Sequence, residues 1–235
     1  MILDNYNYPG DELRLFADAI NWKTYWAKFV SKHIAGDVLE VGAGLGGTYN
    51  LVHNEKVSSW TWLEPDVLMH SQLVTKMNRD NQNIKRCING TIQDIDSEKY
   101  DCIIYIDVLE HIEKDKQEVQ NCISLLSKNG KIIILSPAHN ILYSRFDQNI
   151  GHCRRYNRDL LSALQSKNLI LSEVKYLDSV GLFLNLANRL FLKKSLPSKK
   201  QILFWDKIIV PISKVLDPIL GFKFGKSILG IYEFS

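Results

Sequence analysis

Acidic side chains and glycines lie together where a buried strand is expected to end, an arrangement typical of a ligand site. Val38, Leu39 and Val41 predict a short buried strand, and a glycine-rich turn follows it at 42–47. Gly42 and Gly44 can adopt positive φ angles and have no Cβ, so a ligand can approach the backbone closely. Residues 48–53 suit a helix, whose first N–H groups would point at the same place. The segment predicts a nucleotide-like ligand held by a strand, a turn and a helix.

Two classes of cofactor fit this glycine spacing, and a purely structural junction without ligand is a third interpretation. Gly42, Gly44 and Gly47 match the dinucleotide pattern G-x-G-x-x-G. Glu40 lies two residues before the first glycine, where its charge would repel a pyrophosphate and attract a cationic amino group or sulfonium. We therefore favour a positively charged cofactor.

A second carboxylate, Glu64, follows the next predicted strand, residues 59–63. It lies 20 residues after Gly44, about where an acidic residue binds ribose hydroxyls in nucleotide sites. Its two oxygens can accept hydrogen bonds from both vicinal hydroxyls. The alternative is that Glu64 stabilises the start of the helix that Pro65 and Asp66 open.

Two further predicted strands bring polar segments to the same edge of the sheet. The strand at 84–88 leads into a turn at 89–94, where Thr91, Ile92 or Asp94 would meet an adenine edge unless the turn is only a surface feature. The apolar strand 101–106 leads directly into residues 107–112. A helix over 115–126, ended by residues 128–130, and a strand over 131–135 complete this half of the chain.

Histidines near this edge are candidate general bases, because histidine titrates near neutral pH. His111 follows the strand 101–106, and His152 lies in the polar segment 136–156, with His139 a weaker candidate. Either histidine could instead have a structural role. Arg154 and Arg155 would clamp a carboxylate or phosphate, or else form salt bridges to Asp147 or Asp159.

Apolar periodicity predicts a helix over residues 11–33 that covers the glycine turn. Trp22 and Tyr25 would then lie over the ligand, although both also fit a role as core aromatic residues. Asn157 is expected to cap a helix through about residue 165.

The composition is that of one α/β domain with small additions. The chain has 235 residues, 46% of them hydrophobic and 23% charged, and its net charge of +3 gives no argument for nucleic-acid binding. The four cysteines have no C-x-x-C spacing, so we expect no metal site and a reducing, cytoplasmic setting. No signal peptide or transmembrane helix is predicted.

The C-terminal third changes character. A strand over 169–176, an apolar helix over 180–192, a basic linker over 193–200, an amphipathic helix over 203–220 and a last strand over 225–234 are predicted. The linker and amphipathic helix suggest contact with an anionic membrane, and the alternatives are a substrate lid or a dimer helix.

Together these motifs resemble the class I S-adenosylmethionine (SAM)-dependent methyltransferases over nearly the whole chain. The matching segments are L-E-V-G-A-G-L-G at 39–46, Glu64, D-V-L-E-H-I at 107–112 and L-S-K-N-G at 126–130. The segment G-H-C-R-R-Y at 151–156 is similar to the G-H-x-R-R-Y of one bacterial branch.

This resemblance implies a single domain over 1–235, with a Rossmann-like doubly wound α/β sheet of seven strands in the order 3-2-1-4-5-7-6 and strand 7 antiparallel. Residues 1–34 would be a covering helix and 180–225 a helical insertion or lid. The cofactor SAM, converted to S-adenosylhomocysteine, would contact Glu40, Gly42, Ala43, Gly44, Glu64, Pro65, Thr91, Ile92, Asp107 and Val108. Thr91 departs from the aspartate of many members.

The sequence therefore predicts methyl transfer, with oxygen as the expected acceptor, to a small molecule, glycan or lipid-linked intermediate. The expected catalytic residues are His111 and His152, and the expected substrate-binding residues are Tyr25, His139, Arg154, Arg155 and Tyr156. An NAD(P)-dependent oxidoreductase and a non-catalytic SAM-binding protein are the alternatives. The expected location is the cytoplasm, with peripheral membrane contact through residues 193–220, and no nucleic-acid partner.

Overall fold

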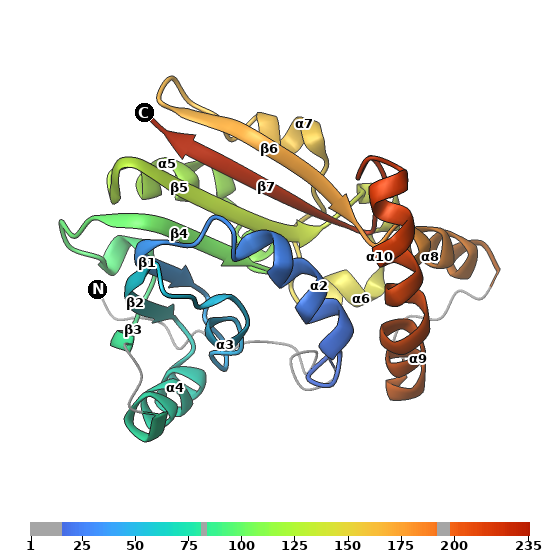
Figure 1. Ribbon diagram of the computed structural model, residues 1–235, viewed down its shortest axis with the longest axis horizontal. Helices are drawn as coiled ribbons and strands as arrows, with labels where there is room; N and C mark the ends of the chain where they lie inside the picture. Colours follow the sequence, from blue (N-terminus) through green and yellow to red (C-terminus); the bar gives the residue numbers. More distant parts are fainter. Residues whose placement is uncertain (1–15, 81–83, 192–197) are drawn as a thin grey trace.

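A seven-stranded mixed sheet forms the centre of the computed structural model, which describes residues 16–80, 84–191 and 198–235. The strand order is β3-β2-β1-β4-β5-β7-β6 (Figure 1). All pairs from β3 to β5 are parallel, whereas β7 runs antiparallel to both β5 and β6. The strands are β1 (Gly36–Val41), β2 (Val57–Glu64), β3 (Ile84–Asn89), β4 (Tyr100–Ile106), β5 (Leu126–Pro137), β6 (Leu169–Leu177) and β7 (Ser227–Phe234).

Helices cover both faces of this sheet, with α2, α3 and α10 on one face and α5 and α7 on the other (Figure 1). In chain order the α-helices are α2 (Ile20–Val30), α3 (Tyr49–Val52), α4 (Val67–Asp80), α5 (Asp115–Ile123), α6 (Arg145–Asn149), α7 (Arg158–Ser162), α8 (Ser179–Phe191), α9 (Lys199–Phe204) and α10 (Val210–Ile219). Short 3₁₀ turns lie at Ile92–Asp94, Leu109–His111 and Asn140–Leu142, and a π-helical segment, Trp205–Ile209, joins α9 to α10.

The apolar strands divide the core between the two faces. Successive side chains of a strand point to opposite faces, so Cys102 and Ile104 of β4 join one core while Ile103 and Tyr105 join the other. This near-continuous burial of β4 is typical of a central parallel strand. Because β1, β2 and β4 are parallel, their carboxyl ends meet at one edge and present their following loops together.

Buried aspartates attach the helices between β6 and β7 to the rest of the molecule. Asp206 accepts hydrogen bonds from the backbone N–H of Trp22 (2.8 Å) and of Asn21 (3.2 Å), at the start of α2. Asp217 accepts one from the Tyr25 hydroxyl at 2.8 Å. Since each of these carboxylates is about 1% exposed or less, the contacts fix α10 and the π-helical segment against α2.

Several predicted boundaries were wrong in detail. The helix after β4 ends at Ile123 rather than 126, and the strand after it begins at Leu126, which is buried and pairs with Tyr100. Asn129, expected at a helix stop, has a positive φ of 63° within this strand. The segment 136–156, expected to be a loop, contains α6. Residue 11, the predicted start of the covering helix, lies outside the described residues, and α2 begins at Ile20. Among the described residues, no helix is long and apolar enough to cross a membrane.

Candidate functional site

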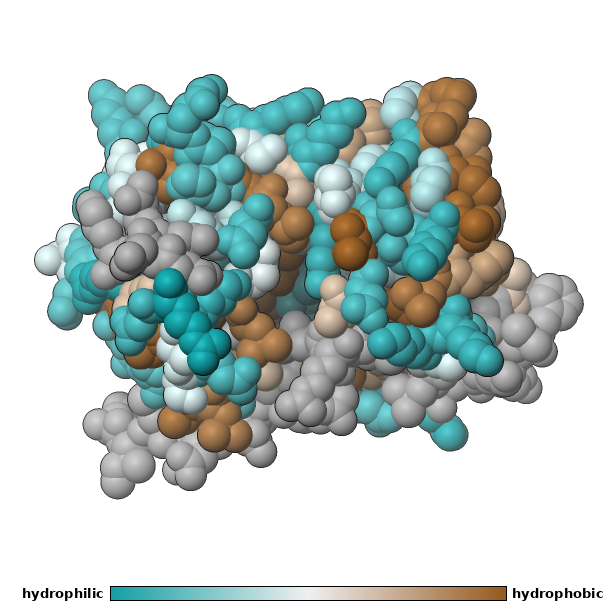
Figure 2. Space-filling view, turned by 60° about the horizontal axis from the view of Figure 1, so that its bottom comes forward, coloured by the Kyte–Doolittle hydropathy of each residue, from teal (hydrophilic) through white to brown (hydrophobic). Residues whose placement is uncertain are grey.

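A large cavity lies at the carboxyl edge of the parallel strands. Its volume is about 1990 Å³, well above the roughly 300–1,000 Å³ typical of small-molecule sites. Its walls come from α2, the glycine turn, the ends of β2 and β4, the segment 142–155 and the helices α8 and α9. The corresponding hollow is visible in the middle of the face shown in Figure 2. Such a cavity has room for a cofactor and a second molecule together.

The glycine turn forms one wall of the cavity. Gly42, Gly44 and Gly46 have positive φ angles of 65°, 57° and 66°, as expected for the first two. A Cβ on Gly42 would lie 2.7 Å from Val108, and one on Gly46 would lie 2.8 Å from Leu73 and 2.9 Å from Trp62. Gly47 has open space around it. The constrained glycines are therefore spaced G-x-G-x-G, which differs from the dinucleotide pattern that would use Gly47.

Glu64 lies at the carboxyl end of β2 and lines the same wall. Its Oε2 accepts the N–H of Gly44 at 2.7 Å and its Oε1 accepts the N–H of Asp66 at 2.9 Å. Burial raises the pKa of Glu64, while these two backbone bonds oppose that shift. Each carboxylate oxygen has a second lone pair, so Glu64 can still accept hydrogen bonds from hydroxyl groups in the cavity.

Glu40 is placed differently from the expectation. It is 2% exposed, is absent from the described residues that line the cavity, and accepts hydrogen bonds from the indole N–H groups of Trp60 (3.0 Å) and Trp62 (2.9 Å). Burial raises its pKa to about 7. Glu40 thus supports the turn from behind, because Trp62 in turn packs against Gly46.

Most of the other predicted cofactor residues meet at this cavity. Ile92 does not line it, because its side chain is 3% exposed and belongs to the core beneath the turn. The predicted residues that line the cavity, besides Glu64, are Gly42, Ala43, Gly44, Pro65, Thr91, Asp107 and Val108.

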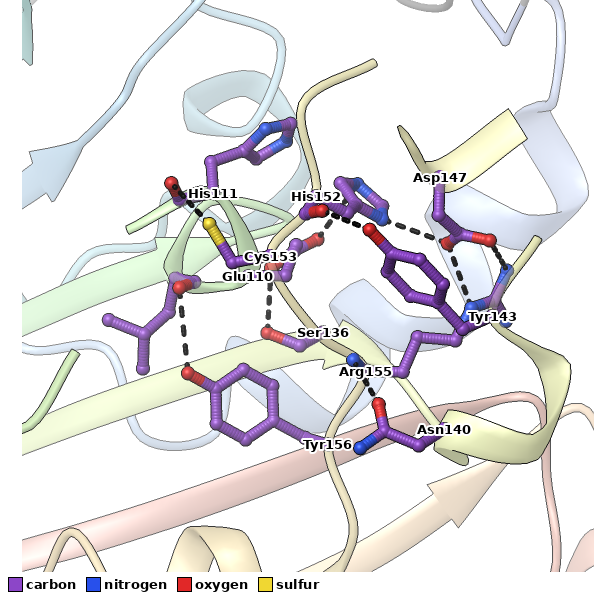
Figure 3. Close-up of polar contacts among 11 residues, drawn as sticks. Glu110, His111, Ser136, Asn140, Tyr143, Asp147, His152, Cys153, Arg155 and Tyr156 are labelled. Atoms are coloured by element: carbon purple, nitrogen blue, oxygen red, sulfur yellow. Dashed lines mark hydrogen bonds and ion pairs between the residues drawn. The ribbon is translucent and has the colours of Figure 1, made fainter. Parts of the chain in front are cut away.

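A chain of polar side chains forms another wall of the cavity, where the segment after β4 meets the segment 144–155 (Figure 3). His152 lies between two carboxylates: its Nδ1 is 3.0 Å from Oδ1 of Asp147 and its Nε2 is 3.8 Å from Oε1 of Glu110. The rings of His111 and His152 meet edge to face with their centroids 4.6 Å apart. Both predicted catalytic histidines therefore lie side by side in the cavity wall.

Burial strongly affects the ionisation of this wall. It raises the pKa of Glu110, as does the charge of Asp107. Asp107 is open to the cavity, yet enough protein surrounds its carboxyl to raise its pKa to about 6. Burial also lowers the pKa of His111 to about 4, and the neighbouring His152 adds to this effect. Burial alone would raise the pKa of Asp147, but the bonds from His152 and Arg155 outweigh it and lower the pKa.

Of the predicted substrate-binding residues, Arg155 lines the cavity and the others do not. Arg155 is held in the salt bridge that the sequence offered as the alternative, with its Nε 2.8 Å from Oδ1 of Asp147. Arg154 does not line the cavity and pairs with Asp115 at 2.8 Å, which is neither of the two salt-bridge partners that the sequence suggested.

Tyr25, Tyr156 and His139 likewise do not line the cavity, and their side chains have partners within the fold. The Tyr25 hydroxyl donates to Asp217, and that of Tyr156 donates to Asp115 at 2.7 Å. His139 stacks on Tyr176 with a centroid distance of 5.0 Å. All three side chains therefore make their contacts with other residues of the protein.

Asp147 and Glu110 are the site residues that sequence reasoning did not identify. The sequence analysis named Asp147 only as a possible salt-bridge partner of an arginine. The pattern S-x-x-D at 144–147 could have identified it, because this pattern predicts the capping box that holds Asp147 at the start of α6. Glu110 was visible within the D-V-L-E-H-I segment, but its role depends on His152 approaching from 42 residues further along the chain.

Comparison with known proteins agrees with this geometry. Residues 39–132 match the model of a family described as "Methyltransferase domain". No curated protein matches the chain. The segment that matches runs from β1 into β5 and contains the glycine turn, Glu64 and the segment 107–112.

Solved structures share the fold at low sequence identity. Coclaurine N-methyltransferase bound to N-methylheliamine and SAH is 13% identical, with a TM-score of 0.60 over 92% of this chain and 72% of that one. An S-adenosylmethionine-dependent methyltransferase from Clostridium acetobutylicum ATCC 824 is 12% identical, with a TM-score of 0.59 over 95% and 94%. The [4+2]-cyclase SpnF is 10% identical, with a TM-score of 0.62 over 96% and 94%. These likenesses establish the fold and leave the reaction to be argued from the site.

Proposed function

We propose that this chain, which has the class I methyltransferase fold, is a SAM-dependent methyltransferase that methylates an oxygen atom of a small molecule, glycan or lipid-linked intermediate. The observation that supports the proposal most strongly is a cavity lined both by the glycine turn with Glu64 and by a polar segment with two histidines. An NAD(P)-dependent oxidoreductase is disfavoured, because a dinucleotide fold uses the strand order 3-2-1-4-5-6 and this sheet has the antiparallel β7 between β5 and β6.

The residues of the first wall fit the cofactor. Glu64 offers its remaining lone pairs to the ribose hydroxyls, and the bare backbone of Gly42 and Gly44 allows the methionine part to approach. Thr91 lies beyond β3, where the adenine would lie by analogy with open α/β sheets. Asp107 brings a negative charge to a site whose ligand carries a sulfonium and an ammonium group.

The second wall faces the acceptor. SAM supplies an electrophilic methyl group, so that an acceptor lone pair forms the new bond to carbon while the carbon–sulfur bond breaks and its electron pair stays on sulfur. The protein has to align that acceptor and exclude water, which can contribute about 7–11 kcal/mol. Oxygen is favoured because His111, His152 and Glu110 form a cluster able to hold a hydroxyl group and assist loss of its proton.

Calorimetry with SAM, S-adenosylhomocysteine and NAD⁺ tests the cofactor assignment. We expect the protein to bind the two adenosyl ligands and not NAD⁺. The Glu64→Gln variant should bind S-adenosylhomocysteine about 10-fold or more weakly, because a charge-assisted hydrogen bond to the ribose contributes roughly 1.5–3 kcal/mol. Asp159→Asn, an exposed change on α7, is the matched control and should bind as the unaltered protein does. Binding of NAD⁺ alone would overturn the assignment.

Turnover distinguishes an enzyme from a non-catalytic SAM-binding protein. Transfer of a radiolabelled methyl group from SAM to hydroxyl-bearing small molecules, glycans or lipid-linked acceptors is the expected result. Tight SAM binding with no methyl transfer to any of these acceptors would favour the non-catalytic alternative.

We also propose that the protein contacts an anionic membrane surface through α9, the π-helical segment and α10. Exposed apolar side chains run along this segment at 204, 208, 212, 215 and 219, three or four residues apart. Figure 2 shows hydrophobic residues gathered at the side where these helices lie in Figure 1. Asp206 and Asp217 point inward and are buried, so the exposed charges of 199–219 are all lysines. Apolar and cationic surface together favour anionic lipid.

A membrane contact of this kind would bring a lipid-linked acceptor to the cavity, because α8 and α9 line it. Residues 193–197 of the predicted membrane segment lie outside the described residues. All four cysteines are free thiols, which supports our proposal of a cytoplasmic location.

A further inference from the structure

We propose that Glu110, His111 and His152 bind one divalent transition-metal ion, a site that the sequence did not predict. Each residue offers one donor atom, and the three donor atoms lie within 4.8 Å of one another. One carboxylate and two imidazoles are the donor set of many catalytic zinc sites, which keep a fourth position open. The inference rests on the proposed methyl transfer for its role, but the site itself stands on the geometry.

The buried carboxylate of Glu110 is the first argument. Glu110 is 0% exposed, and its Oε2 accepts a hydrogen bond from Ser136 at 2.9 Å. Its Oε1 has no hydrogen-bond partner among the described residues and faces Nε2 of His152 at 3.8 Å. A buried, unpaired carboxylate oxygen is costly, and a cation beside it would remove that cost.

The orientation of His152 is the second argument. Asp147 is held by two hydrogen bonds from Arg155, of 2.8 and 3.1 Å, so it acts as an acceptor and Nδ1 of His152 must donate to it. In a neutral imidazole whose Nδ1 carries the proton, Nε2 carries a lone pair and accepts hydrogen bonds. Nε2 of His152 and Oε1 of Glu110 are then two acceptors that face each other. The same carboxylate–histidine arrangement fixes the ring of most metal-binding histidines.

The spacing leaves room for an ion between these acceptors. Two ligand atoms at about 2.0–2.2 Å from a tetrahedral Zn²⁺ lie about 3.4 Å apart, a few tenths of an ångström less than the observed 3.8 Å. His111 approaches from the third side, with its ring 4.6 Å from that of His152. Figure 3 shows these side chains converging from the segment after β4 and the segment around His152.

The open position of such an ion would face the cavity that all three residues line. A bound cation lowers the pKa of a coordinated hydroxyl group and fixes its direction. The acceptor class that follows is an alcohol or phenol that can coordinate metal, and its proton would leave to water through the cavity. The histidines would then act as ligands instead of general bases.

Metal binding to the full-length protein, measured without turnover, tests the inference. After dialysis against chelator, Zn²⁺ titration by calorimetry should show one site, and Co²⁺ should give the visible d–d absorption of a site with nitrogen and oxygen ligands. Glu110→Gln and His152→Gln should each weaken Zn²⁺ binding by about 100-fold or more, because even loss of an outer hydrogen-bond partner costs about 10–100-fold. His53→Gln removes an exposed histidine elsewhere and should leave the site unchanged.

S-adenosylhomocysteine binding, measured on the same samples, separates the two proposals. Variants that bind this ligand normally but have lost Zn²⁺ are folded, and they support the metal site. Unaltered protein that binds the ligand but takes up no stoichiometric Zn²⁺ or Co²⁺ would overturn the metal site alone. Protein that binds Zn²⁺ at these residues but no adenosyl ligand would overturn the proposed function and leave the metal site standing.

Discussion

At the scale of single residues, the site is built from carboxylates that the fold uses in different ways. Each carboxylate oxygen of Glu64 accepts one hydrogen bond from a backbone N–H and has a second lone pair that can accept one from a ligand. Asp147 is fully used in orienting His152 and Arg155. Glu40, which the sequence placed beside the cofactor, instead holds two tryptophans behind the turn. Residue type alone could not distinguish these roles, because each depends on which donors the fold brings near.

Glu40 makes the stability of the protein depend on pH. Its pKa of about 7 in the folded protein lies above the ordinary value of 4.5, so the folded state holds this proton more tightly than the unfolded state. Its contribution to stability therefore falls as pH rises from about 4.5 to 7 and is constant above that, with a total change on the order of 3 kcal/mol. Glu40→Gln, which has no such titration, should gain stability relative to the unaltered protein over this range.

Urea unfolding of both proteins at pH 5, 6, 7 and 8 provides the measurement. The quantity to follow is the difference between their free energies of unfolding, which cancels the titration of the other groups. A difference that stays constant from pH 5 to 8 would show that Glu40 ionises as freely in the folded protein as in the unfolded chain.

At the scale of elements, the order of strands and helices was predictable and several ends were not. Apolar runs located β1, β2 and β4, and Asn157 caps α7 through its side chain, as predicted. The end of α5 was misplaced because the apolar Leu126 fits a helix face and a strand equally well, and only its pairing with Tyr100 decides. Likewise, nothing local to His152 reveals that Glu110 approaches its ring.

The glycine turn gives a matched pair of substitutions. Gly46→Ala should lower the free energy of unfolding by about 1–3 kcal/mol, because alanine at a φ of 66° is strained and its Cβ would meet Leu73 and Trp62. Gly47→Ala should change stability by no more than about 0.5 kcal/mol, because nothing lies within 4 Å of its added Cβ. Thermal and urea unfolding of both variants measure this directly. A loss at Gly47 with little change at Gly46 would mean that the turn uses the dinucleotide spacing after all, and equal losses would mean that Gly47 is as constrained as Gly46.

At the scale of the whole molecule, the cavity and the exposed apolar face share the same helices. α8 and α9 line the cavity, while α9, the π-helical segment and α10 carry the apolar residues outward. The buried Asp206 and Asp217 tie these helices to α2, which forms another wall of the cavity. A surface that binds on the outside would therefore contact the elements that enclose the site. If the proposed membrane contact forms, it would therefore bring lipid-linked acceptors close to the cavity.

Flotation with liposomes tests the docking face. The protein should float with vesicles that contain anionic phosphatidylserine or phosphatidylglycerol and remain unbound with neutral phosphatidylcholine, because apolar insertion and lysine attraction act together. Ile208→Glu with Ile212→Glu should abolish flotation, since both side chains are more than two-fifths exposed and two buried carboxylates in a lipid interface are costly. Leu68→Glu, at a site 68% exposed on α4, should float as before. If the double variant floats as well as the unaltered protein, the membrane contact lies elsewhere. If the unaltered protein still binds the vesicles in about 0.5 M salt, the apolar side chains contribute more to binding than the lysines do.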